Sequence, residues 1–212
     1  MTFVLALWLL QVQAVVLEND HVRVTRDGAP CASATVPGCG DRVIVALSDI
    51  ELQFGNSGRK LARGEIAVFT AGESYEPPRH GAFLEVAIKA NHPPVVSPGE
   101  VIPPEKNAML YDGVRFFVFE ERLGVGDTRP RHSHNQRVVI QLNRTRLQQW
   151  PEGQSEITRD IVPDRVTFNP PVIHTVKNVG GRPLRGVVIE FKAERRRDEA
   201  RAALLAAERK VG

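Results

Sequence analysis

Short runs of β-branched and aromatic residues recur along the chain, and Gly, Pro, Asp or Asn separate them. No helical period occurs before residue 193. Many short strands with regularly spaced turns are typical of a β-sandwich or β-barrel. The clearest runs are VIVAL (43–47), IAVF (66–69), FLEVAIK (83–89), RFFVFE (115–120) and GVVIEF (186–191). The pattern predicts an all-β fold.

The hydrophobic pattern occurs twice. RVIVALSDIELQ at residues 42–53 is matched by RVVIQLNRTRLQ at residues 137–148. Flanking segments agree as well, because LEVAIKA (84–90) resembles VVIEFKA (187–193). A repeat of this length indicates two copies of one supersecondary unit.

The repeat sets the predicted domain boundaries. The first β unit covers residues 15–90 and the second covers residues 107–192. Residues 91–106 are rich in proline, which fixes φ and cannot join a central ladder, so we expect an extended linker there. Residues 193–212 have alanine and leucine at helical spacing and predict a C-terminal α-helix. It would pack on the barrel or on a sister subunit, or else have a membrane or regulatory role.

Residues 1–14 differ from the rest of the chain. An apolar run from Phe3 to Leu10 precedes Val12-Gln13-Ala14, a small-x-small pattern that favours a cleaved signal peptide. No Lys or Arg precedes the apolar run, so a buried first strand is the alternative. Cleavage would leave a mature chain starting near Val15 and a periplasmic or secreted protein; without it we expect a cytoplasmic one.

Composition narrows the class of protein. Hydrophobic residues make up 42% of the chain and charged residues 25%, as in ordinary globular proteins. The net charge of +3 is mild, and basic residues form no stripe with aromatic ones, which argues against nucleic-acid binding. No apolar run reaches the roughly 18 residues of a membrane span. Cys31 and Cys39 would pair in an oxidising compartment, or else remain two thiols.

Three histidines form a candidate metal site. His132 and His134 are two positions apart, so on a strand both face the same side. His174 lies in a second strand-like run, VIHTV. If a barrel places the two strands side by side, three imidazoles converge and leave positions open for water or substrate. We therefore expect a divalent transition metal (Fe, Zn, Mn, Ni or Cu), with a metal-free remnant as the alternative. We expect His21, His80 and His92 to be surface or loop residues.

At these residues the sequence resembles the cupin superfamily, and the repeat makes it similar to a two-domain bicupin. The family's first motif, G-x5-H-x-H-x3,4-E-x6-G, is matched by Gly126, His132 and His134. Val138 stands four residues after the second histidine, in the place of the glutamate. The resemblance implies two tandem antiparallel β-barrels of the double-stranded β-helix type, with a metal inside the second.

The family's second motif, G-x5-P-x-G-x2-H-x3-N, is matched at its last two named positions by His174 and Asn178. Pro163, Asn169 and Pro171 stand where the family has Gly, Pro and Gly. A three-histidine site without glutamate is similar to that of the thiol dioxygenase branch, in which an iron ion binds substrate and oxygen.

The first half matches the scaffold without the ligands. Pro37, Cys39 and Tyr75 align with the three histidines, whereas Gly64 and Gly72 align with the two glycines of the second motif. We therefore expect a degenerate N-terminal barrel with a structural or dimerising role.

Four other side chains are relevant to a site. By strand alternation, Gln136 faces the same side as the histidines and is a candidate to coordinate weakly or to orient a ligand. Arg137 has the opposite parity and a counterpart, Arg42, in the metal-free half, so we interpret it as structural. Whichever of Glu120 and Glu121 faces inward is the nearest candidate for a general base, or else a rim carboxylate in a salt bridge.

Two functions follow from these features. The first is a metal-dependent enzyme, such as an oxygenase or isomerase, that acts on a small molecule in the second barrel. The alternative is a non-catalytic cupin module for ligand binding or assembly. Because cupins commonly pair through their barrels, we expect a homodimer in either case.

Overall fold

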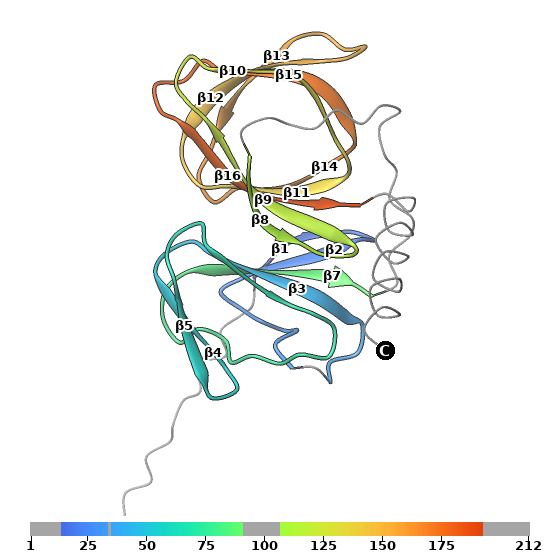
Figure 1. Ribbon diagram of the computed structural model, residues 1–212, viewed down its shortest axis with the longest axis vertical. Helices are drawn as coiled ribbons and strands as arrows, with labels where there is room; N and C mark the ends of the chain where they lie inside the picture. Colours follow the sequence, from blue (N-terminus) through green and yellow to red (C-terminus); the bar gives the residue numbers. More distant parts are fainter. Residues whose placement is uncertain (1–13, 34, 91–106, 193–212) are drawn as a thin grey trace, which may run out of the picture.

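The computed structural model describes residues 14–33, 35–90 and 107–192, and every regular element in these ranges is a β-strand (Figure 1). The first unit contains β1 (Ala14–Glu18), β2 (Val22–Arg26), β3 (Cys39–Ala46), β4 (Ile50–Phe54), β5 (Ser57–Leu61), β6 (Ile66–Phe69) and β7 (Phe83–Lys89). The second contains β8 (Ala108–Asp112), β9 (Phe116–Leu123), β10 (Thr128–His134), β11 (Arg137–Gln141), β12 (Thr145–Pro151), β13 (Ile157–Ile161), β14 (Val166–Asn169), β15 (Val172–Asn178) and β16 (Leu184–Phe191). The predicted all-β fold is confirmed. The predicted signal segment at 1–14, apart from Ala14 at the start of β1, lies outside the described residues, as do the predicted linker at 91–106 and the predicted helix at 193–212.

Both units are built on the same five-stranded antiparallel sheet. The first has the order β1-β2-β7-β3-β6 and the second has β14-β11-β16-β9-β8. Each is completed by a smaller sheet, β4-β5 in the first unit and β10-β15-β12-β13 in the second. The repeat is visible in the register, because Arg42 on β3 and Arg137 on β11 each lie between two equivalent neighbouring strands.

The two five-stranded sheets share one hydrophobic core. Alternate residues of β3 and β7, such as Val43 and Val86, point into it from the first unit. Val138 and Ile189 point into it from the second, and all four are fully buried. In Figure 1 the two sheets lie face to face between the barrels. His21 lies in the same layer with its ring 5.4 Å from that of Phe168; it is a loop residue before β2, one of the two predicted possibilities, and it is buried.

Two turns at equivalent positions lie at this interface. Gly64, before β6, has φ +90°, and Asp164, before β14, has φ +62°. In the second barrel Asp164 therefore has the left-handed backbone conformation that Gly64 has in the first. The sequence alignment places Pro163, one residue earlier, at this position. Aspartate tolerates this left-handed region better than most residues. Its carboxylate also accepts a hydrogen bond from Arg63 at 2.6 Å, which joins the two barrels.

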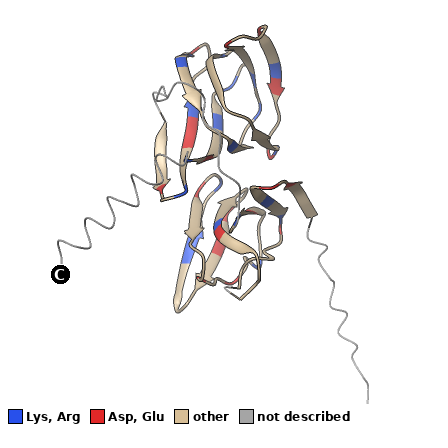
Figure 2. Cartoon of the chain, turned by 90° about the vertical axis from the view of Figure 1, so that its right-hand side faces the viewer, with Lys and Arg blue, Asp and Glu red and all other residues tan. Residues whose placement is uncertain are grey.

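Cys31 and Cys39 form a disulfide, with their Cα atoms 5.6 Å apart. Of the two predicted alternatives, a disulfide or two free thiols, the structure contains the disulfide. No helix of membrane-spanning length and hydrophobicity occurs in the described ranges. Basic and acidic positions are interspersed over the strands of both barrels, without a basic stripe (Figure 2).

Candidate metal centre

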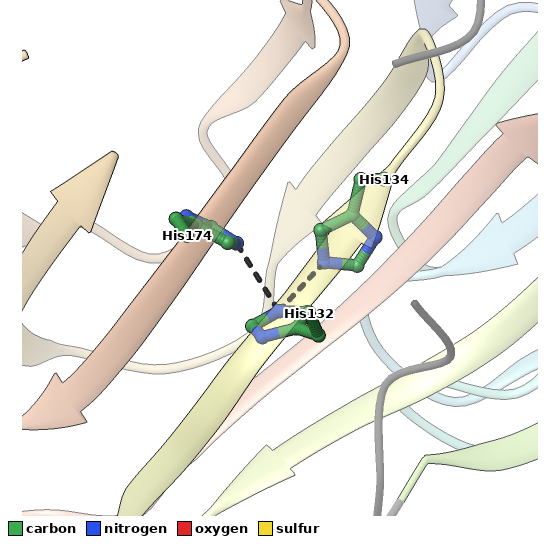
Figure 3. A group of neighbouring side chains, drawn as sticks. All are labelled: His132, His134 and His174. Carbon is green, nitrogen blue, oxygen red and sulfur yellow. Dashed lines mark hydrogen bonds between the residues drawn. The ribbon is translucent and has the colours of Figure 1, made fainter. Parts of the chain in front are cut away.

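The three predicted ligands come from two paired strands of the second barrel. β10 carries His132 and His134, and β15 carries His174 directly opposite His132 in the antiparallel register. The two-residue spacing gives both β10 histidines the same inward face. All three side chains are buried, and Figure 3 shows the rings pointing toward one another.

The Nε2 atoms of the three rings converge. Nε2 of His132 lies 3.1 Å from Nε2 of His134 and 3.1 Å from Nε2 of His174. One ligand atom from each ring falls within a group whose members are all within 4.8 Å of one another. Among the described residues, this is the one such group of three or more His, Cys, Asp or Glu side chains.

Hydrogen bonds on the far side of two of the rings, those of His132 and His134, fix their tautomers. Nδ1 of His132 lies 2.8 Å from the carbonyl oxygen of Pro130, and Nδ1 of His134 lies 2.7 Å from a carboxylate oxygen of Glu190. Both partners accept, so each Nδ1 carries the proton and donates. In the neutral rings Nε2 then presents a lone pair. The other oxygen of Glu190 accepts the backbone N–H of Asn135 at 2.8 Å, which fixes the carboxylate.

The rings are also held neutral. Burial, together with the charges of the other two histidines, lowers the pKa of His174 to about 2. Burial lowers the pKa of His132 as well, and burial followed by the charge of Arg137 lowers that of His134 well below its ordinary value. Neutral imidazole is the form that binds a metal.

A cavity of about 110 Å³ adjoins the histidines inside the barrel. His134 and His174 are among its lining residues, and His132 is not. Val139, Val176 and Val188 contribute apolar surface, and Arg159 and Arg165 also line it. The cavity places the imidazoles next to space for a small ligand.

The strand alternation does not continue past the histidines. β10 ends at His134 and β11 begins at Arg137, so the two residues between them shift the parity. Arg137 therefore lines the cavity, and Gln136 is not among the lining residues. The parity argument that placed Gln136 beside the histidines, and Arg137 away from them, is wrong for this reason.

Arg137 nevertheless has the structural contacts expected from its counterpart. Its Nη1 donates to the carbonyl oxygens of Asn135 and Pro170, at 3.2 and 3.0 Å. Nη1 of Arg42 donates to Gly40 and Thr70, both at 2.9 Å, in the same arrangement. In both barrels the arginine ties the start of a strand to the turn opposite.

The same shift moves the position of the missing glutamate. Val138 points into the core between the barrels, whereas Val139 faces the cavity. Val139 is therefore the residue that stands where a carboxylate ligand would reach the site. Because both residues are valine, neither position supplies a carboxylate as a fourth ligand beside the three histidines.

Of the two candidate acids, Glu121 faces inward and lines the cavity. It forms an ion pair with the buried guanidinium of Arg129. Burial acts to raise its pKa, but the net effect is a lowered pKa, to which the positive charges of Arg129 and Arg137 contribute. Glu120 instead points away from the cavity, is also buried, and pairs with Arg122 and Arg185.

Asn178, the last residue of the second motif, holds the turns around the site. It is fully buried. Its Oδ1 accepts from the hydroxyl of Thr145 at 2.7 Å and from the backbone N–H of Gly180 at 3.0 Å, and its Nδ2 donates to Leu123 at 3.1 Å. Its carbonyl oxygen accepts the backbone N–H of Gly126, which has φ +80°. The two motifs therefore meet at this asparagine.

The first barrel has a different interior. Tyr75 donates its hydroxyl to the fully buried carboxylate of Glu85, which also accepts the backbone N–H of Cys31 at 3.1 Å. Cys39 is in the disulfide, so it is not available as a ligand. The contact between Tyr75 and Glu85 spans 10 residues and that between His134 and Glu190 spans 56, and no sequence motif indicated either of them.

The geometry of the histidines fits a metal ion. Nitrogen ligands lie about 2.1 Å from a first-row ion, so two of them at a right angle are about 3.0 Å apart. The two Nε2 separations from His132, both 3.1 Å, agree, and the ligand atoms of all three rings lie within 4.8 Å of one another. The contact between the two Nε2 atoms of His132 and His134 is not a hydrogen bond, because both rings carry their proton on Nδ1. A cation accepting both lone pairs removes that repulsion.

Solved structures show which fold this is. The putative glyoxylate-induced protein from Pseudomonas aeruginosa superposes with a TM-score of 0.59 at 10% identity, covering 81% of this chain and 75% of the other. The cupin 2 conserved barrel domain protein from Leptotrichia buccalis gives 0.54 at 13% identity, covering 85% and 88%. Oxalate decarboxylase from Bacillus subtilis gives 0.50 at 12% identity, covering 86% and 75%.

These matches span both barrels and confirm the resemblance to two-domain cupins at the level of the fold. No protein-family model matches the chain, and no curated protein matches it. At these identities the likeness carries no information on the reaction.

Proposed function

We propose that this two-barrel cupin binds one divalent transition-metal ion through Nε2 of His132, His134 and His174, and acts on a small molecule in the adjoining cavity. The observation that carries the proposal is the pair of Nδ1 hydrogen bonds, to Pro130 and Glu190. They leave two buried Nε2 lone pairs directed at each other at 3.1 Å. Without a cation this contact is repulsive, and with one it is a pair of ligand bonds.

The ligand set supports a catalytic rather than a structural centre. Three protein ligands leave coordination positions for water or substrate, whereas structural sites are closed by four. A bound first-row ion would supply Lewis acidity, or redox chemistry if it is iron, manganese or copper. An oxygenase and an isomerase are both compatible with three neutral imidazoles.

The chain's own residues have definable roles around that centre. Glu190 and Pro130 orient the imidazoles and keep their protons on Nδ1. The ionised carboxylate of Glu121 lines the cavity and can accept a proton from a ligand there. Val139, Val176 and Val188 limit the water in the cavity.

Elemental analysis by mass spectrometry tests the proposal on protein purified without a histidine tag. Wild type is expected to contain close to one equivalent of a first-row transition metal. His134→Ala should lose it, and His80→Ala should keep it, because His80 is exposed in the first barrel. Equal metal content in all three proteins, or none after reconstitution, would overturn the proposal.

An oxidising compartment is the proposed location of the protein. The disulfide between Cys31 and Cys39 supports it, since such bonds persist mainly outside the cytosol. The intact mass of protein recovered from an export-competent host tests the proposal. A chain starting near Val15 is expected, and a full-length chain with free thiols would contradict it.

A further inference from the structure

Three arginines line the cavity beside the histidines. Arg137 is buried inside the barrel, whereas Arg159 on β13 and Arg165 before β14 lie at the exposed rim. A guanidinium presents several N–H donors in a plane and remains charged at all ordinary pH values. The cavity therefore has cationic donors both inside and at its entrance.

Arg137 has hydrogen-bonding capacity to spare. Its two hydrogen bonds both run from Nη1, and no described residue accepts one from its Nη2. Arg42 differs here, because its Nη2 donates to the carbonyl oxygen of Glu73. Nη2 is thus engaged at this arginine position in the first barrel and is a free donor beside the cavity in the second.

The rim arginines lack carboxylate partners within the described residues. Glu121 pairs with Arg129, and Asp160 lies 3.8 Å from Arg146. Arg159 donates to the neutral amide oxygen of Gln149 at 3.1 Å, and the Glu121 carboxylate acts on its charge without forming an ion pair with it.

The two rim arginines also repel each other. Desolvation, followed by the charge of Arg165, lowers the pKa of Arg159. Two like charges held close together at a cavity entrance are stabilised when an anion lies between them.

The remaining lining limits the kind of anion. Val139, Val176, Val188, Leu147 and Ile161 present hydrocarbon. A carbon skeleton gains from this surface, whereas an inorganic phosphate or sulfate does not. The volume of about 110 Å³ is that of roughly four water molecules, which suits an acid of about two to four carbon atoms.

We infer that the cavity binds a small carboxylate, held by Arg137, Arg159 and Arg165, with its other end toward the histidines. This deepens the proposed function by naming the substrate class, and rests on it for the role of the histidines. Arginine binds carboxylate through paired, charge-assisted hydrogen bonds, which supply both affinity and orientation. The arginines would hold the anionic end of the ligand and so direct its other end toward the histidines.

Isothermal titration calorimetry with malonate tests this inference. The comparison ligands are malonamide, which has the same skeleton without charge, and inorganic phosphate. Malonate is expected to bind wild type more tightly than either. The double variant Arg159→Gln with Arg165→Gln should weaken malonate binding about tenfold to a hundredfold, because charge-assisted hydrogen bonds are lost. Arg144→Gln removes the same charge from an exposed position away from the cavity and should have no effect.

Three outcomes would overturn the inference: no malonate binding to folded wild type, equal binding of malonamide or phosphate, or an unaffected double variant. Circular dichroism establishes that each variant is folded. Metal analysis on the same samples separates this inference from the proposed function. If the protein contains no metal, if His134→Ala does not change its metal content, and if it still binds malonate, the inference stands and the metal proposal is removed.

Discussion

The two barrels each have a five-stranded sheet of the same topology but differ in the strands that complete it. In the second barrel four strands, β10-β15-β12-β13, face the five-stranded sheet, and the histidines lie on β10 and β15. In the first barrel the corresponding sheet is the hairpin β4-β5. A site of converging ligands requires two paired strands at fixed register, and among the described residues only the second barrel has them there.

The interiors also satisfy their polar groups in different ways. In the first barrel the Glu85 carboxylate is closed by the Tyr75 hydroxyl and the N–H of Cys31. In the second, the Glu190 carboxylate turns the proton of His134 away from the centre and leaves a lone pair facing inward. A buried carboxylate thus has its hydrogen bonds satisfied within the core of one barrel, whereas in the other it orients a histidine for metal binding.

The largest expected effect is on stability, from substitutions in the hydrophobic core that the two barrels share. Phe191→Ala, in the core between the sheets, is expected to cost about 3–5 kcal/mol of unfolding free energy, because a fully buried ring is replaced by a cavity. Ile88→Ala, from the other barrel, should destabilise the same transition. Denaturant unfolding followed by fluorescence and circular dichroism measures this. Separate transitions, each sensitive to only one substitution, would show that the barrels are independent; the exposed Val179→Ala serves as the control.

A smaller effect is expected from the disulfide of the first barrel. Replacing Cys31 and Cys39 together by alanine opens a loop with a sequence separation of 8 and is expected to cost about 2.5 kcal/mol through unfolded-state entropy. Metal content should not change, because the loop belongs to the other barrel. Thermal unfolding and elemental analysis of one preparation measure both quantities. Loss of metal would contradict the division of roles between the barrels.

Substitution of the buried carboxylates Glu190, in the second barrel, and Glu85, in the first, compares their effects on metal affinity. Glu190→Gln leaves one acceptor oxygen for the two donors, His134 Nδ1–H and the N–H of Asn135. We expect metal affinity to fall about tenfold to a hundredfold. Glu85→Gln makes the matching change in the first barrel and should leave the affinity unchanged. Competition with a chromophoric chelator gives both values, and equal affinities for Glu190→Gln and wild type would count against the tautomer argument.

The smallest expected effect is a pH dependence of stability from the first barrel. Burial raises the pKa of Glu85 above its ordinary value of 4.5, although hydrogen bonds from Tyr75 and Cys31 act to lower it. The folded state therefore holds the proton more tightly than the unfolded state. The stability from this group is fully present below about pH 4.5 and is lost as the pH rises through the raised pKa. Subtracting the unfolding free energy of Glu85→Gln from that of wild type across pH isolates it; a difference that grows with pH would contradict the assignment.

The sequence predicted what local alternation and the repeat control. The all-β fold, the duplication and the pairing of His132 and His134 with His174 all follow from residues two apart on strands and from matching segments. The prediction failed where the alternation is interrupted. The break after His134 exchanged the directions of Gln136 and Arg137 and moved the cavity-facing position from Val138 to Val139.

Other features could not be predicted because they depend on contacts between distant strands. Glu190 lies 56 residues from His134, and only the pairing of β11 with β16 brings it to the site. The burial of His21 against Phe168 depends on the packing of one barrel on the other. No local pattern specifies either contact.

The most direct measurement of the central claim is anomalous diffraction from crystals at the absorption edge of the metal that co-purifies with the protein. The account predicts a single strong peak in the second barrel, about 2.0–2.2 Å from Nε2 of His132, His134 and His174. It also predicts no peak near Tyr75 and Glu85. A peak elsewhere, or three histidines with no peak between them in metal-reconstituted crystals, would contradict it.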